Sequence, residues 1–271
     1  MPIISCATLK GGCGKTTTAI NLAAALLRQG KTVLLIDSDP QANLSQSLGI
    51  PDEPEKNLFT ALSKEIAGEG SQLGDVIAQT KAGIDVIPSS IELAGAELEL
   101  VSVYGREQMY SWMLENIKNQ YDYVLIDCPP SIGMLTVNSL VASNYVLMPL
   151  QAEFLPLKGV RTFIAHLKAI QKLNKQLQIL GFVITRYDER KIMNRQVNDE
   201  LEREFGDKTF KTHIRSNIQL ANAQQAGVDI FSFDKHCHGA EDYQKLADEF
   251  LQKINDSTEK KIKDKELSET S

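Results

Sequence analysis

The sequence has no long hydrophobic run. No stretch approaches the roughly 18 consecutive apolar residues that a membrane-spanning helix needs. Its N-terminus also lacks the charged-then-apolar pattern of a secretory signal. The 271 residues are nevertheless 42% hydrophobic, which is enough to bury a single large core. We therefore expect a cytoplasmic protein with no membrane partner.

Closely spaced cysteines and an excess of positive charge are missing too. Cys6, Cys13, Cys128 and Cys237 lie far apart and form no CxxC pair, which favours free thiols in a reducing cytosol. The net charge is −6 and the pI is about 5.4. This balance argues against a constitutively basic nucleic-acid binder. Any contact with nucleic acid would have to come from a local patch, such as one assembled on dimerisation.

Residues 9–17, with the sequence LKGGCGKTT, are the most informative stretch, and we call them the glycine loop. A β-branched apolar run precedes the loop and a helical pattern follows it, as in phosphate-binding loops. The glycines allow backbone N–H groups to converge on an anion, and the helix N-terminus adds partial positive charge. In such a loop Lys15 reaches the β- and γ-phosphates, and the Thr16 hydroxyl binds Mg²⁺. The expected nucleotide-binding residues are Lys10, Gly11, Gly12, Cys13, Gly14, Lys15, Thr16 and Thr17.

Two further apolar runs end in aspartate. Residues 33–37 end in Asp37, with Asp39 two positions later, and residues 123–127 end in Asp127 before two prolines. Ligands of open α/β sheets bind at the carboxyl ends of the strands, so these carboxylates are candidates for a functional site. A solvated turn that caps the next helix would be the structural explanation of Asp37 and Asp39. The candidate metal residues are Thr16, Asp37 and Asp127.

Strand and helix patterns alternate along the chain, with each strand–helix unit about 30 residues long. This order indicates a parallel sheet with right-handed crossovers. We predict an α/β fold of the P-loop NTPase type, with a mostly parallel twisted sheet and helices on both faces. Residues 1–255 are expected to form a single ATPase domain. Residues 256–271 are almost all charged or small and polar, which predicts a disordered tail.

The lysine at the head of the glycine loop is unusual. The general Walker pattern has glycine where this chain has Leu9, and Lys10 follows it. The motif K-G-G-x-G-K-T resembles the deviant Walker A motif of the ParA/MinD superfamily of ATPases. Together with residues 37–43, 122–133 and 239–243, it makes the chain similar to ParA-type (Soj-like) partition ATPases of the short class. The resemblance runs from residue 2 to about residue 254.

The resemblance implies a weak ATPase with ATP and Mg²⁺ as cofactors. Lys15 would bind phosphate, Lys10 would reach across a dimer interface to the partner's nucleotide, and Asp39 would position the attacking water. These three are the expected catalytic residues. One family position implicated in DNA binding is Arg190, whereas Arg215 stands where relatives usually have proline, near the expected adenine site. The candidate DNA-binding residues are Arg190, Lys191, Arg195 and Arg215.

The implied function is an ATP-driven positioning switch. An ATP-bound homodimer would bind double-stranded DNA without sequence preference, in the cytoplasm and on the nucleoid. A ParB-like or other cargo adaptor would trigger hydrolysis and release. The alternative is a MinD-like membrane-cycling ATPase, which needs a C-terminal amphipathic helix, but only Ile262 and Leu267 are apolar after Asp256. Electron transfer similar to that of the nitrogenase iron protein would need cluster-bridging cysteines, and none lies between Cys13 and Cys128.

Overall fold

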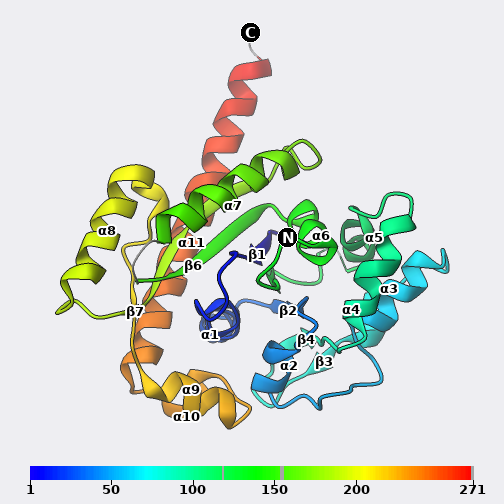
Figure 1. The fold of residues 1–271 in the computed structure, drawn as a ribbon, viewed down its shortest axis with the longest axis horizontal. Helices are drawn as coiled ribbons and strands as arrows, with labels where there is room; N and C mark the ends of the chain where they lie inside the picture. Colours follow the sequence, from blue (N-terminus) through cyan, green and yellow to red (C-terminus); the bar gives the residue numbers. More distant parts are fainter. Residues whose placement is uncertain (118, 153–155, 270–271) are drawn as a thin grey trace.

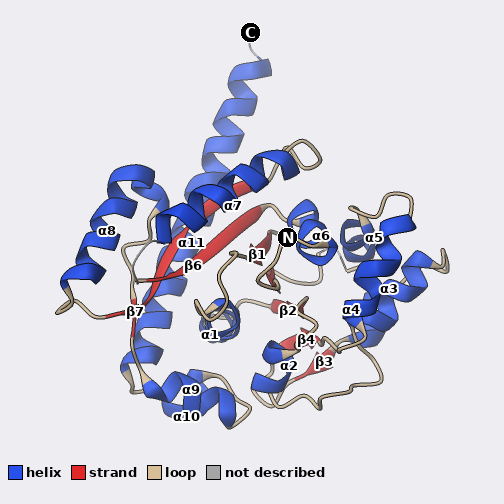
Figure 2. Ribbon diagram, viewed as in Figure 1, coloured by secondary structure: helices blue, strands red, loops and turns tan. Residues whose placement is uncertain are grey.

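The computed structural model describes residues 1–117, 119–152 and 156–269. Within them lies an eight-stranded sheet with the order β3-β4-β2-β5-β1-β6-β7-β8 (Figure 2). Neighbouring strands pair in parallel, except that β3 runs antiparallel to β4. The strands are β1 (Ile3–Cys6), β2 (Val33–Asp37), β3 (Ala78–Gln79), β4 (Asp85–Ile87), β5 (Tyr123–Asp127), β6 (Tyr145–Gln151), β7 (Gln178–Tyr187) and β8 (Ile214–Arg215).

Helices cover both faces of this sheet (Figure 1). The α-helices are α1 (Lys15–Arg28), α2 (Asn43–Ser47), α3 (Leu58–Ile66), α4 (Leu93–Glu99), α5 (Met109–Glu115), α6 (Met134–Ala142), α7 (Pro156–Ile170), α8 (Ile192–Phe205), α9 (Ile218–Gln225), α10 (Ile230–Asp234) and α11 (His238–Glu269). Short 3₁₀ turns lie at Leu73–Val76, Leu100–Ser102 and Gly206–Lys208. The predicted α/β fold with a mostly parallel sheet is confirmed.

The central strand β2 is buried on both faces of the sheet. Leu34 and Ile36 belong to the core beneath helices α3 to α8. Val33 and Leu35 belong to the core beneath α1, α2, α9, α10 and α11. Successive side chains of a strand point to opposite faces, so a strand covered on both sides needs an apolar residue at every position. This requirement explains why the sequence shows continuous apolar runs here.

The strands β1, β2 and β5 end together at one edge of the sheet. Asp127 pairs in register with Cys6 of β1 on one side and with Asp37 of β2 on the other. The three segments that follow these strands therefore leave the sheet at neighbouring points. The glycine loop is one of them, and the two predicted carboxylates stand directly beside its base.

The last helix, α11, continues past the predicted domain boundary. The structure continues α11 through residues 256–269, within the segment 256–271 for which composition predicts a disordered tail. The segment is rich in lysine and glutamate, which are good helix formers, and extending a packed helix avoids the cost of a new nucleus. In Figure 1 this part of α11 extends beyond the rest of the chain. A single domain over residues 1–255 stays a prediction.

Candidate nucleotide-binding site

The glycine loop connects β1 to α1 with two residues in the left-handed region of the backbone. Gly12 has φ 72° and Gly14 has φ 89°. A side chain is costly at such angles, so glycine is the residue that fits them. Gly14 is the N-cap of α1 and supplies no side-chain cap, which leaves the first N–H groups of the helix open to a ligand. This geometry suits an anion at the start of α1.

Contacts from β7 hold the glycine loop in place. The hydroxyl of Thr185 donates a hydrogen bond to the Cys13 carbonyl at 2.8 Å, and the Leu150 carbonyl lies at 3.3 Å from the same hydroxyl. Inside the loop, the Cys13 thiol donates to the Lys10 carbonyl at 3.2 Å. Burial raises the pKa of this thiol, so it stays protonated and can act as the donor. Sequence reasoning did not identify Thr185, because it lies 172 positions from Cys13 in the chain.

The two lysines of the loop have different environments. Lys15, in the first turn of α1, is buried and lines the cavity described below. Lys10 is exposed at the head of the loop and does not line that cavity in the described part of the chain. The arrangement places one cation inside the site and presents the other on the surface.

The two strand-end carboxylates are both buried, but their partners differ. Asp37 accepts hydrogen bonds from the backbone N–H (2.9 Å) and the hydroxyl (2.7 Å) of Ser45, and from the N–H of Asp39 (3.2 Å). Both of its oxygens are therefore occupied. Asp127 accepts one hydrogen bond, from the Thr16 hydroxyl to Oδ2 at 2.6 Å, and its Oδ1 has no partner among the described residues.

Burial sets the protonation of these two groups. It raises the pKa of Asp37 to about 6 against the hydrogen bonds from Ser45, which oppose the shift. The pKa of Asp127 is raised further, to about 8, by burial and then by the neighbouring Asp37. A cation beside Asp127 would favour its charged form and reverse this shift. Asp127 is thus the carboxylate whose charge depends most on a ligand.

Thr16 and Asp127 fit a magnesium ion. A hydroxyl and a buried carboxylate with an unpaired oxygen stand at the base of the loop, and Mg²⁺ takes oxygen ligands from one or two protein groups, phosphates and water. Within the described residues, no group of three or more His, Cys, Asp or Glu side chains could hold a metal by itself. The predicted metal role of Asp37 competes with its hydrogen bonds to Ser45 and Asp39 and stays a prediction.

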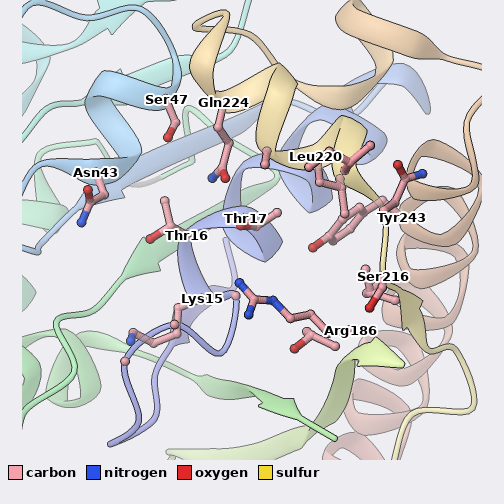
Figure 3. Close-up of a pocket in the computed structure, with 18 of the residues that line it drawn as sticks. Lys15, Thr16, Thr17, Asn43, Ser47, Arg186, Ser216, Leu220, Gln224 and Tyr243 are labelled. Carbon is pink, nitrogen blue, oxygen red and sulfur yellow. The ribbon is translucent and has the colours of Figure 1, made fainter. Parts of the chain in front are cut away.

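The cavity above the loop has a volume of about 750 Å³ (Figure 3). Its floor is the glycine loop and the start of α1, and Asp39 also lines it. Asp39 is half-buried, and its Oδ1 accepts a hydrogen bond from the Gln41 N–H at 3.0 Å. The opposite wall comes from β8, α9 and α11. Its members include Ile214, Arg215, Ser216, Asn217, Ile218, Leu220, Ala221 and Tyr243.

Comparison with known proteins now places the chain. A family model described as an AAA domain matches residues 1–179. The sporulation initiation inhibitor protein Soj of Bacillus subtilis is 43% identical over 249 residues, which cover 91% of this chain and 97% of Soj. The chromosome partitioning protein ParA of Caulobacter vibrioides is 38% identical over 94% of this chain and 95% of its own.

The chain belongs to the Soj/ParA family of chromosome-partitioning ATPases. Among solved structures, cobyrinic acid a,c-diamide synthase of Mycobacterium smegmatis with ADP and magnesium is 32% identical. Its TM-score is 0.80, and the match covers 94% of this chain and 96% of the synthase. The same synthase is also known with an ATP analogue and magnesium. The cofactors expected from the sequence, ATP and Mg²⁺, are those of these relatives, and the resemblance to ParA-type ATPases is confirmed.

For this Soj/ParA family member, the candidate DNA-binding residues do not share one environment. Arg190 and Lys191 are exposed between β7 and α8, where Arg190 pairs with Asp188 at 2.9 Å. Arg195, on the first turns of α8, donates to a backbone carbonyl at 2.8 Å. Arg215 instead lines the cavity and binds Asp242 at the start of α11, at 2.6 Å. Their roles in DNA binding stay predictions.

Proposed function

We propose that this protein binds MgATP in the cavity and hydrolyses it slowly. The observation that carries the proposal is Oδ1 of Asp127, which has no hydrogen-bond partner within the described residues and lies buried beside the Thr16 hydroxyl at the foot of the glycine loop. An uncompensated buried polar atom is costly, so its retention favours a ligand that satisfies it. When bound, Mg²⁺ would neutralise phosphate charge and bridge the nucleotide to Thr16 and Asp127.

Asp39 is proposed to orient the attacking water. Asp39 lines the cavity and is half-buried, so its carboxylate can accept a hydrogen bond from a water that faces the γ-phosphate. Lys15 would stabilise the charge that builds on the transferred phosphoryl group. Intrinsic turnover is expected to be weak until a partner protein completes the site.

ATP is proposed to drive the formation of a homodimer. Lys10 is exposed at the head of the glycine loop and does not line its own cavity, so it can reach a nucleotide held by a second copy. Two triphosphates that face each other across an interface repel unless cations from both subunits neutralise them. ADP lacks the γ-phosphate that such a contact needs.

The dimer is proposed to bind double-stranded DNA without sequence preference. The net charge of −6 opposes DNA binding, so the contact has to come from a local basic surface that dimerisation doubles. Arg190, Lys191 and Arg195 lie together near the start of α8 and could form it. Arg215 lines the cavity and is paired with two carboxylates, whereas Arg190, paired with Asp188, is exposed outside the cavity beside Lys191, which favours the residues near α8. A ParB-like or other cargo adaptor would trigger hydrolysis and release the protein from the nucleoid.

Two measurements test this cycle. In sedimentation with ATP, the Asp39→Ala variant should be a stable dimer, because it binds ATP but hydrolyses it slowly. The matched Lys10→Ala variant should bind nucleotide yet stay monomeric. In fluorescence anisotropy, unrelated duplexes should bind equally well with ATP, poorly with ADP, and more weakly as salt increases. A monomeric Asp39→Ala protein, or equal DNA affinity with ADP and ATP, would contradict the proposal.

Two other functions, that of a synthase and that of a membrane-cycling ATPase, have to be distinguished from partitioning. One structural relative is named as a synthase, but the match to Soj has the higher identity over nearly the whole of both chains, which favours partitioning. A membrane cycle stays the alternative, and it would need an apolar face at the end of α11, where only Ile262 and Leu267 are apolar after Asp256. None of the helices in the described residues has the length and apolar character of a membrane span. ATP-dependent sedimentation with anionic vesicles would indicate the membrane cycle.

A further inference from the structure

Arg186 has an unusual backbone conformation at the end of β7. Its φ is 51°, in the left-handed region that is costly for a residue with a side chain. Thr185 pairs with Ile214 and Tyr187 pairs with Arg215, so two steps along β7 match one step along β8. Arg186 is therefore the extra residue of a β-bulge. Bulges of this kind redirect a side chain and are frequent beside active sites.

The bulge directs Arg186 into the cavity. Figure 3 shows its side chain extended across the space toward the start of α1, where Lys15 and Thr17 lie. It is exposed and makes no hydrogen bond or ion pair with any described residue. The neighbouring Arg215 lines the same cavity, but its guanidinium is held by Asp242 and Glu241. Of these two arginines, only Arg186 has a charge that the described chain leaves uncompensated.

The position of Arg186 in the cavity indicates which part of a ligand it meets. Thr185, the residue before it, bonds the glycine loop at Cys13, where the terminal phosphates would lie. Tyr187, the residue after it, pairs with Arg215 on the opposite wall. Arg186 thus stands between the floor and the wall. A guanidinium there can give two parallel N–H bonds to phosphate oxygens.

We propose that Arg186 positions the nucleotide by binding its α-phosphate, next to the ribose. The inference rests on the proposed nucleotide site and adds a residue that neither the glycine loop nor the carboxylates indicate. The strained backbone of the bulge is maintained because it places the cation on the ligand. An α-phosphate is common to ADP and ATP, so the contact should serve both nucleotides equally.

Titration calorimetry with ADP and with ATP, each with Mg²⁺, tests the contact. Arg186→Met should lower the affinities for ADP and for ATP by a similar factor of about 10 or more, since it removes a charge-assisted contact. Arg186→Lys keeps the charge and should recover part of the affinity. Arg203→Met makes the same chemical change on an exposed arginine in the last turn of α8 and should have no effect.

A glycine variant separates ligand binding from a structural role. Arg186→Gly should melt at about the wild-type temperature without nucleotide, because relief of backbone strain offsets the entropy that glycine adds to the unfolded chain. Its nucleotide affinity should fall as far as that of Arg186→Met. A large drop in melting temperature for the glycine variant would show that Arg186 is structural and would overturn the proposal.

The remaining outcomes are also decisive. Unchanged affinity in Arg186→Met, or an equal loss in Arg203→Met, would overturn the contact. A loss for ATP alone would place the guanidinium on the γ-phosphate and contradict the α-phosphate assignment. Lys15→Ala, measured in the same series, tests the site itself. If Lys15→Ala lowers nucleotide affinity and Arg186→Met does not, the nucleotide site stands and only the proposed role of Arg186 is wrong. If Lys15→Ala leaves the affinity unchanged, the proposed nucleotide site itself is wrong.

Discussion

The floor and the far wall of the cavity are built in different ways. The floor comes from one continuous segment, the glycine loop, and the buried ends of two adjacent strands, at Asp37 and Asp127, lie behind it. The far wall comes from β8, which is two residues long, from α9, and from Tyr243 of α11. A binding surface that depends on local backbone geometry can be encoded by a short sequence motif. A wall that depends on shape is assembled from segments that only packing brings together.

The partners of the charged groups show the same contrast. On the floor, Lys15 is buried, and behind it an Asp127 oxygen has no partner among the described residues. On the wall, Arg215 is already satisfied by Asp242, whose side chain is only 5% exposed. We therefore expect substitutions on the floor to affect ligand binding and those at Arg215 to affect stability.

The largest effect is expected from Lys15→Ala. It removes the buried cation of the floor, so nucleotide affinity should fall by at least about 100-fold, the loss of two or more charge-assisted hydrogen bonds. Tyr243→Phe, a change on the wall, removes only a hydroxyl that lies 3.4 Å from the Thr18 hydroxyl, and it should cost a few-fold at most. Calorimetry with ATP compares the two. Similar losses in both variants would erase the distinction between floor and wall.

The floor should also make stability depend on pH. The pKa of Asp127 is about 8 and that of Asp37 about 6, both above the ordinary value near 4. The native state therefore retains protons that the unfolded chain has released, and the contribution of these groups, complete below about pH 4, is lost as pH rises toward 8. The slope can reach about 1.4 kcal/mol per pH unit for each carboxyl.

Urea denaturation without nucleotide, at several values between pH 5 and pH 8, measures this slope. Asp127→Asn should remove the slope between about pH 6 and pH 8 and reduce it below pH 6, since Asp127 contributes over the whole range and Asp37 only up to about pH 6. Saturating MgADP should flatten the wild-type slope as well, because a bound cation favours the charged carboxylate. A slope that is the same in Asp127→Asn would rule out this carboxyl as its origin.

A smaller effect is expected at the contact between β7 and the glycine loop. Thr185→Val removes the hydroxyl that bonds the Cys13 carbonyl, and should lower stability by about 1–2 kcal/mol and nucleotide affinity a few-fold. Thr162→Val is the matched control, because its exposed hydroxyl bonds a carbonyl within α7. Thermal melting and ATP titration should change for the first variant and hardly for the second. Equal melting temperatures would show that the glycine loop holds its shape without β7.

The smallest effect is expected on the wall itself. Arg215→Gln leaves the buried Asp242 without its guanidinium partner, but the arginine side chain is 39% exposed and solvent screens the pair. We expect a loss of about 1 kcal/mol in unfolding free energy and little change in nucleotide affinity. Arg161→Gln breaks a surface pair with Glu204 and should cost less than that. A larger effect on ATP binding than on stability would indicate that Arg215 contacts the ligand and is not only a structural residue of the wall.

Much of the fold and of the floor could be predicted from the sequence. The strand β2 and the strand β5 both end in the predicted aspartates, and helix α1 follows the glycine loop. The short elements β3, β8, α2 and α10 were not predicted, because two to five residues carry no periodic pattern. The role of Thr185 depends on a contact across 172 residues, which no local motif encodes.

By itself the sequence determined the chemistry at the carboxyl ends of the central strands. The roles predicted for the glycines, Lys15 and Thr16 depend on backbone geometry and side-chain type within one short segment, and the apolar runs place the carboxylates. Tertiary structure decided which of two equivalent aspartates keeps an oxygen unpaired, and which of two neighbouring arginines is paired. Asp37 meets Ser45 and Arg215 meets Asp242, whereas Asp127 and Arg186 have polar atoms without a partner in the described part of the chain. The availability of a charge depends on its neighbours in space, and packing sets those neighbours.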